Sequence, residues 1–350
     1  MRRLWGSQCP LHILLLVLCG FTGLLWSQQA ETDKSKPSVR RSGNLEDWNT
    51  LSLSGSALRP DKPVPGETDD FPQFTRELIQ VKWRPGDGID LYIIRPKGTA
   101  KPPVVLYLYG YPTETDRFRD NDYCQRITSN GFAAIGFVSA LTGHRYKNRP
   151  MKEWFVSELQ EALVTSVHDV QMILNFLATR DDLDLSKVGI FGEGSGGTIA
   201  VLAAANDPRI KVVDLLDPWA DWPDWMRDST LIPEEERPNY LKAEFLNKVR
   251  DLDPLKWLPQ LKTQQVRIQQ VMEDTVTPKI AKQRIQSAAP ATATVLSYEN
   301  NGEFYRAASA GRVFQWVKDQ LRALDRTQPQ VGKLPGSEPS LSGTDPGHSN

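Results

Sequence analysis

The stretch VGIFGEGSGG, residues 188–197, passes from a short apolar run through closely spaced glycines into the small-residue segment 198–205. This order predicts a buried strand, a tight turn and a helix, because glycine accepts backbone conformations that other residues avoid. On both sides of the stretch, β-prone runs alternate with segments whose apolar residues recur at helical spacing. Such alternation predicts an α/β fold, with a mostly parallel central sheet and helices on both of its faces.

The remaining elements are predicted from the same patterns. Strands are expected at 78–83, 89–94, 104–109, 132–138, 188–191, 212–216, 266–272 and 293–298, and helices at 155–178, 198–205, 278–288 and 307–324. The turn sequence PGDG, residues 85–88, predicts that the first two strands form an antiparallel hairpin. The run 104–109 is almost continuously β-prone, which is typical of a strand covered on both faces.

The stretch 188–197 resembles the nucleophile elbow of the α/β-hydrolase superfamily, whose pattern is Gly-x-Ser-x-Gly. The resemblance extends over about 76–324, and the chain looks similar to dienelactone hydrolases, acetyl-xylan esterases and prolyl-oligopeptidase-like domains. The sequence GYP around Tyr111, after the third strand, looks like the loop that completes the oxyanion hole. Asp274 follows a strand where the triad acid is expected. The resemblance implies that the backbone N–H groups of Tyr111 and Ser195 form that oxyanion hole.

The nucleophile position of this elbow holds Gly194, and Ser195 comes one residue later. The resemblance implies small residues two positions before and after the nucleophile, where the backbone packs tightly. Gly192 and Gly196 meet this need for position 194, whereas Ser195 as nucleophile would place Glu193 at the first of them. The nucleophile conformation also costs a non-glycine residue roughly 1–3 kcal/mol. We therefore expect position 194 to be a vacated nucleophile position, with Ser195 as a displaced nucleophile the alternative.

The histidine of the triad is expected after the last strand, usually as Gly-His ahead of an aromatic residue. The sequence GEF, residues 302–304, stands there, so Glu303 replaces the histidine. His168 falls on the predicted helix 155–178 and is expected to be packed or hydrogen-bonded there. His144 lies in a basic loop, where a surface role is expected, and His348 lies in the C-terminal tail.

These two departures leave three hypotheses for the function. In the first, the chain is a catalytically impaired relative of serine esterases and peptidases that retains a binding pocket, because proton transfer and the acyl-enzyme route are both lost. In the second, an active carboxylic-ester or peptide hydrolase uses Ser195. In the third, a carboxylate-based hydrolase uses Asp274 and Glu303, since a close carboxyl pair would raise one of their pKa values. Asp274 before Thr-x-x-Pro is also typical of a helix N-cap. Two independent departures together favour the first hypothesis.

Residues 217–226 combine three tryptophans with three aspartates. Lid segments of the superfamily commonly enter after this strand, so a lid is expected at about 218–260. Trp219, Trp222 and Trp225 could stack on a sugar or on an apolar ligand. The alternative is that they pack the lid onto the core, which is what buried tryptophans usually do. A small-molecule ester, sugar or peptide is the ligand class that these features indicate.

The amino-acid composition of the chain limits the classes of function that it could have. The 350 residues include 42 basic and 43 acidic side chains, a balance that gives no indication of nucleic-acid binding. Cysteines and histidines are too few for a metal cluster, and no cofactor is expected. Once Cys9 and Cys19 are removed with the leader, Cys124 stands alone, which excludes an internal disulfide and predicts a buried thiol. The sequence does not predict an oligomeric state.

The N-terminus has the layout of a secretory signal peptide over residues 1–30. Arg2 and Arg3 precede an apolar run to about Trp26, and small residues follow. That run is shorter than the roughly 20 residues that a spanning helix needs. We therefore expect an exported protein, periplasmic or secreted, with no stable membrane span after cleavage. An uncleaved membrane anchor is the alternative.

Two further segments flank the predicted domain. Residues 31–75 are polar and proline-rich, which predicts a linker or a wrapping arm. Residues 326–350 are rich in Pro, Gly, Ser and Thr, which predicts a disordered tail. Between them we expect one α/β-hydrolase domain over 76–325, a size that suits a single core.

Overall fold

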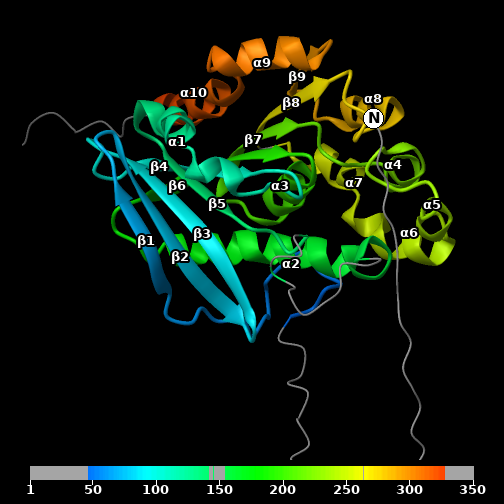
Figure 1. Cartoon of the computed structure of the whole chain (residues 1–350), viewed down its shortest axis with the longest axis horizontal. Helices are drawn as coiled ribbons and strands as arrows, with labels where there is room; N and C mark the ends of the chain where they lie inside the picture. The colour runs from blue at the N-terminus through cyan, green and yellow to red at the C-terminus, as the bar shows by residue number, and fades with distance from the viewer. Residues whose placement is uncertain (1–45, 142–144, 146–153, 263, 328–350) are drawn as a thin grey trace, which may run out of the picture. The chain divides into compact units, whose positions relative to one another are not determined.

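The computed structural model describes residues 46–141, 145, 154–262 and 264–327, over which nine strands form one sheet in the order β1-β2-β3-β5-β4-β6-β7-β8-β9 (Figure 1). The strands are β1 (Val64–Asp70), β2 (Phe74–Arg84), β3 (Asp87–Pro96), β4 (Pro103–Leu108), β5 (Ala133–Phe137), β6 (Asp184–Glu193), β7 (Ile210–Leu216), β8 (Gln265–Val271) and β9 (Thr294–Tyr298). The α-helices of the same residues are α1 (Asn121–Thr128), α2 (Trp154–Leu177), α3 (Ser195–Asn206), α4 (Trp222–Asp228), α5 (Arg237–Tyr240), α6 (Ala243–Val249), α7 (Pro254–Trp257), α8 (Lys279–Ala288), α9 (Asn301–Ser309) and α10 (Arg312–Thr327).

The sheet combines an antiparallel edge with a parallel centre. β2 and β3 pair antiparallel, with Gln80 opposite Asp90, which confirms the predicted hairpin. β1 extends the hairpin on its outer side, and β3 meets β5, both antiparallel. From β5 through β4, β6, β7 and β8 to β9 each pairing is parallel. The prediction of a mostly parallel sheet is confirmed, and the carboxyl ends of these strands meet at one edge.

The sheet begins earlier in the chain than the predicted domain. β1 lies within the segment 31–75, which the sequence indicates as a linker or arm, and the predicted domain start at residue 76 falls inside β2. The physical reason is that β1 packs almost none of its side chains. Val64 is 59% exposed, and most of the strand is exposed with it. A strand without a buried face has no alternation of apolar and polar residues to reveal it.

Helices cover both faces of the sheet, as predicted. Side chains alternate along each strand, so β4 sends Leu106 into the core on one face and Tyr107 into the core on the other. The first core includes buried residues of α2 and α3, and the second includes buried residues of α1 and α10. Figure 1 shows α2 running along one side of the sheet and α1 and α10 on the opposite side.

The predicted lid region, 218–260, contains the short helices α4 to α7 between β7 and β8. It is a packed part of the domain, with Trp222 and Trp225 at 1% and 0% exposure in the core that α2 and α3 share. The helices α4 to α7 lie together on one side of the molecule in Figure 1. No helix among the described residues is long and apolar enough to cross a membrane.

Several sequence predictions concern residues outside those that the structure describes. They are the signal peptide over residues 1–30, the first part of the polar segment, residues 31–45, the loop histidine His144 and the tail from residue 328 with His348. The last described helix, α10, extends to Thr327, two residues beyond the predicted end of the domain.

A buried ion pair joins two central strands. Arg267 of β8 donates from Nε and Nη2 to the two carboxylate oxygens of Asp214 of β7, at 2.9 and 2.6 Å. Gln269 adds a third hydrogen bond to this carboxylate. Both charged side chains are almost fully buried, so each depends on its partner to offset the cost of leaving water.

We predict that Asp214→Ala strongly destabilises the fold. The substitution leaves the Arg267 guanidinium buried without its carboxylate, which costs about 3–5 kcal/mol. Urea unfolding would measure the loss. Asp228→Ala is the matched control, because Asp228 pairs with Arg227 at the surface and should cost less than about 1 kcal/mol. Equal losses in the two variants would contradict the role given to the buried pair.

Candidate functional site

The turn between β6 and α3 forms the centre of the candidate site. Gly194 adopts φ 56° and ψ −121°, a combination that side chains with a Cβ atom rarely accept. A Cβ atom on Gly194 would lie 3.2 Å from Nε1 of Trp219. The strained apex that the elbow requires therefore falls on position 194, where glycine relieves it.

Close backbone packing requires glycine two residues before and two residues after the apex. A Cβ atom on Gly192 would lie 2.6 Å from the carbonyl oxygen of Gly196, and one on Gly196 would lie 2.1 Å from that of Leu108. Real Cβ atoms essentially never approach so closely. Tight packing two residues before and two residues after position 194 is the pattern that the elbow resemblance implies for a nucleophile at 194.

Ser195, the first residue of α3, faces the loop after β4 instead of the solvent. Its exposure is 0%, and its Oγ accepts a hydrogen bond of 2.9 Å from the backbone N–H of Tyr111. Tyr111 is the residue that the resemblance assigns to the oxyanion hole. The N–H group that would stabilise an oxyanion thus donates to the Ser195 hydroxyl in this structure.

A cavity of about 260 Å³ opens in front of Gly194. Its lining comes from the loops after β4, β6, β7 and β8 and from α9 after β9. Ligands of open α/β sheets bind at this edge, beyond the carboxyl ends of the strands. The lining includes Tyr111, Gly194, Trp219 and Asp274 from the residues predicted from sequence, whereas Ser195 lies behind it.

Two carboxylates of the cavity share a buried lysine. The Lys282 Nζ lies 3.5 Å from Oδ1 of Asp217 and 3.6 Å from Oδ2 of Asp274. Burial raises the pKa of Asp217 to about 7, against the lowering effects of Lys282 and of the Val271 N–H. Asp274 also accepts hydrogen bonds from the backbone N–H groups of Val276 and Thr277, at 3.3 and 3.0 Å. These two hydrogen bonds fix the conformation of the loop before α8. Asp274 therefore has a structural role and also lines the cavity.

A second pair of charges also belongs to the cavity. Nη1 of Arg117 lies 3.1 Å from Oε2 of Glu193, and the Arg117 guanidinium sits over the Tyr109 ring, 4.4 Å from its centroid. Burial raises the pKa of Glu193, while Arg117 opposes that shift. Both charged residues line the cavity.

Sequence reasoning did not single out Asp217, Lys282, Glu193 or Arg117 as a group. One pattern in the sequence could have revealed part of this group. Asp217 directly follows β7, and Asp274 lies shortly after β8. Side chains at the carboxyl ends of neighbouring parallel strands meet at one edge of the sheet. No group of three or more His, Cys, Asp or Glu side chains suited to a metal ion occurs among the described residues.

Glu303 caps the N-terminus of helix α9 and does not line the cavity. Its backbone N–H donates to Oδ1 of Asn300 at 3.0 Å, and its Oε2 accepts from the N–H of Glu299 at 2.7 Å. This reciprocal arrangement is a variant of the capping box at a helix N-terminus. The cavity is lined instead by Phe304 and Tyr305 of the same helix, so the structure does not bring Glu303 to Asp274 there.

The three tryptophans of the insertion occupy different positions. Trp219 lines the cavity, although only 2% of its surface is exposed. Trp225 packs against Trp219 with ring centroids 4.7 Å apart, and Trp222 meets Trp225 edge to face. Trp222 and Trp225 do not line the cavity, so only Trp219 is placed to contact a ligand there.

His168 and Cys124 match the structural roles expected from the sequence. Both ring nitrogens of His168, a residue of α2, make hydrogen bonds, one with the Glu46 carboxylate and one with the Thr50 carbonyl oxygen. Cys124 is buried, and its Sγ donates to the Phe118 carbonyl oxygen at 3.1 Å. Neither residue lines the cavity at Gly194.

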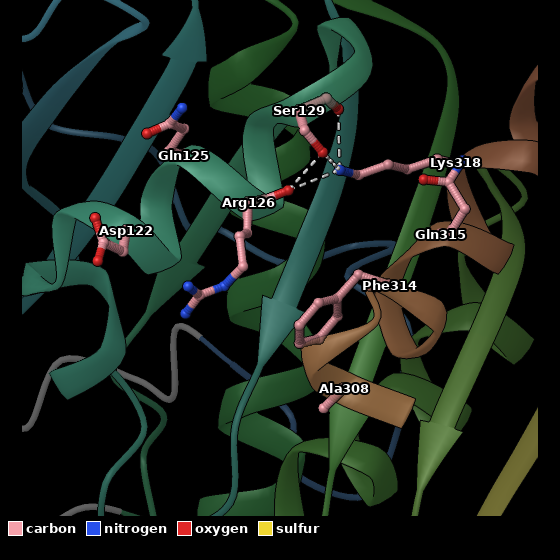
Figure 2. Close-up of a pocket in the computed structure, with 9 residues that line it drawn as sticks. Asp122, Gln125, Arg126, Ser129, Ala308, Phe314, Gln315 and Lys318 are labelled. Atoms are coloured by element: carbon pink, nitrogen blue, oxygen red, sulfur yellow. Dashed lines mark hydrogen bonds between the residues drawn. The ribbon is translucent and has the colours of Figure 1, made fainter. Parts of the chain in front are cut away.

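A second cavity, of about 380 Å³, lies between α1 and the α9–α10 turn (Figure 2). Figure 2 shows the Lys318 ammonium pointing at the C-terminal end of α1, where it donates to the carbonyl oxygens of Arg126 and Ser129 at 3.2 and 3.0 Å and to the Ser129 hydroxyl. Burial lowers the pKa of Lys318 to about 8, and nearby Arg322 adds to this. The lysine caps α1, and the elbow contributes nothing to this cavity.

The chain is similar to known proteins over most of its domain. The family model of the X-Pro dipeptidyl-peptidases (S15 family) matches residues 85–322. YtaP of Bacillus subtilis (strain 168), which is named as a hydrolase, is 29% identical over 140 residues, or 35% of this chain and 46% of YtaP. The chain thus spans about half the length of this curated relative.

Solved structures show the same architecture. Acetyl xylan esterase 1 from Thermoanaerobacterium sp. JW/SL YS485 superposes with a TM-score of 0.56 at 15% identity, over 76% of this chain and 91% of the esterase. The acylaminoacyl peptidase of Pyrococcus horikoshii superposes with a TM-score of 0.52 at 15% identity, over 80% of this chain and 44% of the peptidase. At such identities the likeness shows the fold alone. Because the family model spans most of the domain, this α/β-hydrolase-fold chain belongs to the S15 family, the X-Pro dipeptidyl-peptidases.

Proposed function

We propose that this member of the S15 family has lost serine hydrolysis and uses the cavity at Gly194 to bind a small ester, sugar or peptide ligand. The observation that supports this most directly is the elbow itself. A glycine occupies the strained apex, and the neighbouring Ser195 hydroxyl is buried against the Tyr111 N–H. A serine hydrolase needs a serine that reaches the substrate and a histidine that activates it, and no serine or histidine is among the described residues that line the cavity.

The cavity keeps features of a binding site. It combines the aromatic side chains of Trp219 and Tyr305 with charged groups that could orient a polar ligand. Ligand pockets are typically apolar clefts with a few convergent polar groups. We further propose that the protein works outside the cytoplasm, because residues 1–30 have the layout of a signal peptide.

A second candidate function retains catalysis through a carboxylate. Asp217 lines the cavity, and its pKa of about 7 suits a general base at neutral pH. In this candidate Asp217 takes the part that the sequence suggested for Glu303, because Glu303 caps α9. Lys282 and the Val271 N–H would then hold Asp217 in place.

Turnover of p-nitrophenyl acetate separates these functions. We predict that the wild-type chain, Ser195→Ala, Glu303→Gln and Asp217→Asn all hydrolyse the ester at the same low rate, because no serine or histidine lines the cavity in the described part of the chain. A loss of turnover in Ser195→Ala alone would establish a displaced nucleophile. A loss in Asp217→Asn alone would establish the carboxylate candidate.

Ser195→Ala should also show what the hydroxyl does in the fold. Without it the partly buried Tyr111 N–H loses this acceptor, which should lower the free energy of unfolding by about 1 kcal/mol. Ser287→Ala is the matched control, since Ser287 is exposed on α8 and bonds only within its own helix. Urea unfolding of both variants checks this, and equal stabilities would contradict the buried contact.

The pKa of Asp217 predicts a specific dependence of stability on pH. Because the folded value of about 7 exceeds the ordinary value of 3.8, the folded protein holds a proton that the unfolded chain has released between these values. Stability from this group is therefore present at acid pH and is lost as pH rises through that window. Relative to Asp217→Asn, the wild-type chain should lose about 1 kcal/mol per pH unit there. Urea unfolding between pH 4 and pH 8 measures this, and parallel curves would contradict it.

A further inference from the structure

The cavity in Figure 2 has the size of a small-molecule site and is separate from the cavity at Gly194. Its volume is about 380 Å³, and ligand pockets typically measure about 300–1,000 Å³. One wall consists of α1 and of Ser129 just after it, and the other consists of Ala308 of α9, the turn at Gly311 and α10. No described residue lines both cavities.

The apolar part of this cavity is the ring of Phe314, which three other aromatic rings hold in place. Tyr107, Tyr123 and Phe191 meet it edge to face, with ring centroids at 5.7, 6.0 and 5.2 Å. Such contacts favour one orientation of the ring. Ala308 lies close to the ring in Figure 2 and contributes only a methyl group to the lining. The ring is therefore a rigid surface against which a flat apolar group can pack at little cost in entropy.

Arg126 brings a positive charge to the same cavity. It belongs to the last turn of α1 and is exposed, and Figure 2 shows its guanidinium and the Phe314 ring on facing sides. The guanidinium carbon lies 6.0 Å from the centroid of the Tyr123 ring. Arg126 forms no ion pair among the described residues, even with Asp122 one turn earlier on α1. A guanidinium group without a carboxylate can pair with the carboxylate of a ligand, through two parallel hydrogen bonds.

Lys318 of α10 adds a second positive charge, on a side chain that is almost fully buried. Its ammonium donates to the carbonyl oxygens of Arg126 and Ser129 and to the Ser129 hydroxyl, so each of its three protons has an acceptor. These acceptors are neutral groups, and no carboxylate of the described residues forms an ion pair with Lys318. The hydrogen bonds of Lys318 are thus satisfied, while its charge is offset by partial charges at the α1 C-terminus rather than by an anion.

The start of α10 also favours an anion in this cavity. Gly311 and Phe314, at the N-terminal end of the helix, belong to the lining. The N-terminus of a helix carries a partial positive charge, which acidic residues in the first turn often offset. α10 has no acidic residue in its first turn. Together with Arg126 and Lys318, this helix end gives the cavity an excess of positive charge over Asp122, the one acidic residue of the described lining.

We propose that this cavity is a second ligand site, which takes a small aromatic carboxylate with its ring on Phe314 and its carboxylate on Arg126. The ring and the guanidinium line one cavity from facing walls, so a flat acid whose carboxylate is attached to its ring can contact both. An inorganic anion would leave the Phe314 ring uncovered, and a neutral aromatic compound would leave Arg126 without a carboxylate. The proposal does not depend on the ligand of the cavity at Gly194, because the two cavities have separate linings.

Binding of 2-naphthoate to the full chain, measured by calorimetry, tests the proposed chemistry. We expect saturable binding of this acid and about tenfold or more weaker binding of the neutral 2-naphthamide, because the charge-assisted hydrogen bonds to Arg126 are lost. Arg126→Gln should weaken binding of the acid by a similar factor. The matched control, Arg250→Gln, replaces an exposed arginine outside the lining and should bind the acid as the wild-type chain does. Equal affinities for the acid and the amide, or wild-type binding in Arg126→Gln, would overturn the proposal.

Amide NMR spectra of the wild-type chain locate the bound acid without any variant. Added 2-naphthoate should shift the signals of Ser129, Gly311 and Gln315, with the affinity that calorimetry gives. Unchanged signals at these three residues would contradict the proposal. Shifts at Gly110 and Gly194 alone would contradict it as well, because the acid would then occupy the other cavity.

Discussion

The backbone turn at Gly194 is the constraint on which the candidate site depends. Its φ of 56° and ψ of −121° place the apex at the carboxyl end of β6, and the adjacent glycines let the strand, the turn and α3 pack at distances that exclude side chains. An active elbow holds its nucleophile in a strained conformation, which stores free energy at the site. With glycine at the apex this strain disappears, while the geometry of the turn is retained.

The groups around the glycine apex make structural contacts. The Tyr111 N–H, which the fold would direct at an oxyanion, donates to the buried Ser195 hydroxyl, so the loop after β4 and the start of α3 are joined. Asp274 approaches Lys282 and shapes the loop before α8, and Glu303 caps α9. Residues that a triad would use for proton transfer thus stabilise the strand ends and helix starts that surround the cavity.

Much of the fold could be predicted because its signals are local. The glycine turn, the hairpin turn at 85–88 and the apolar runs of the parallel strands each specify their structure within a few residues. β1 escaped prediction because its side chains are mostly exposed, and it is held by backbone pairing and by the ion pairs of Asp69 and Asp70. The pairing of Asp214 with Arg267 could not be predicted, since it depends on the register of two strands far apart in the sequence.

The site could be predicted only in part, for the same reason. The apex register follows from the spacing of glycines, which is local. The surroundings of Asp217, Lys282 and Glu193 depend on how five strand ends converge, and no sequence spacing reports that. The chemistry of Trp222 and Trp225 is compatible with packing in the core and with stacking on a ligand. Only their burial in the structure distinguishes the two roles.

The central claim is that position 194 is the apex and that no reactive serine faces the cavity. The measurement that tests it most directly is labelling of the purified full chain with a fluorophosphonate probe, read by intact mass. An unchanged mass, under conditions where an active serine hydrolase is fully labelled, is the result that the account predicts. A single adduct mapped to Ser195 would contradict it and would make this chain a serine hydrolase with a displaced nucleophile.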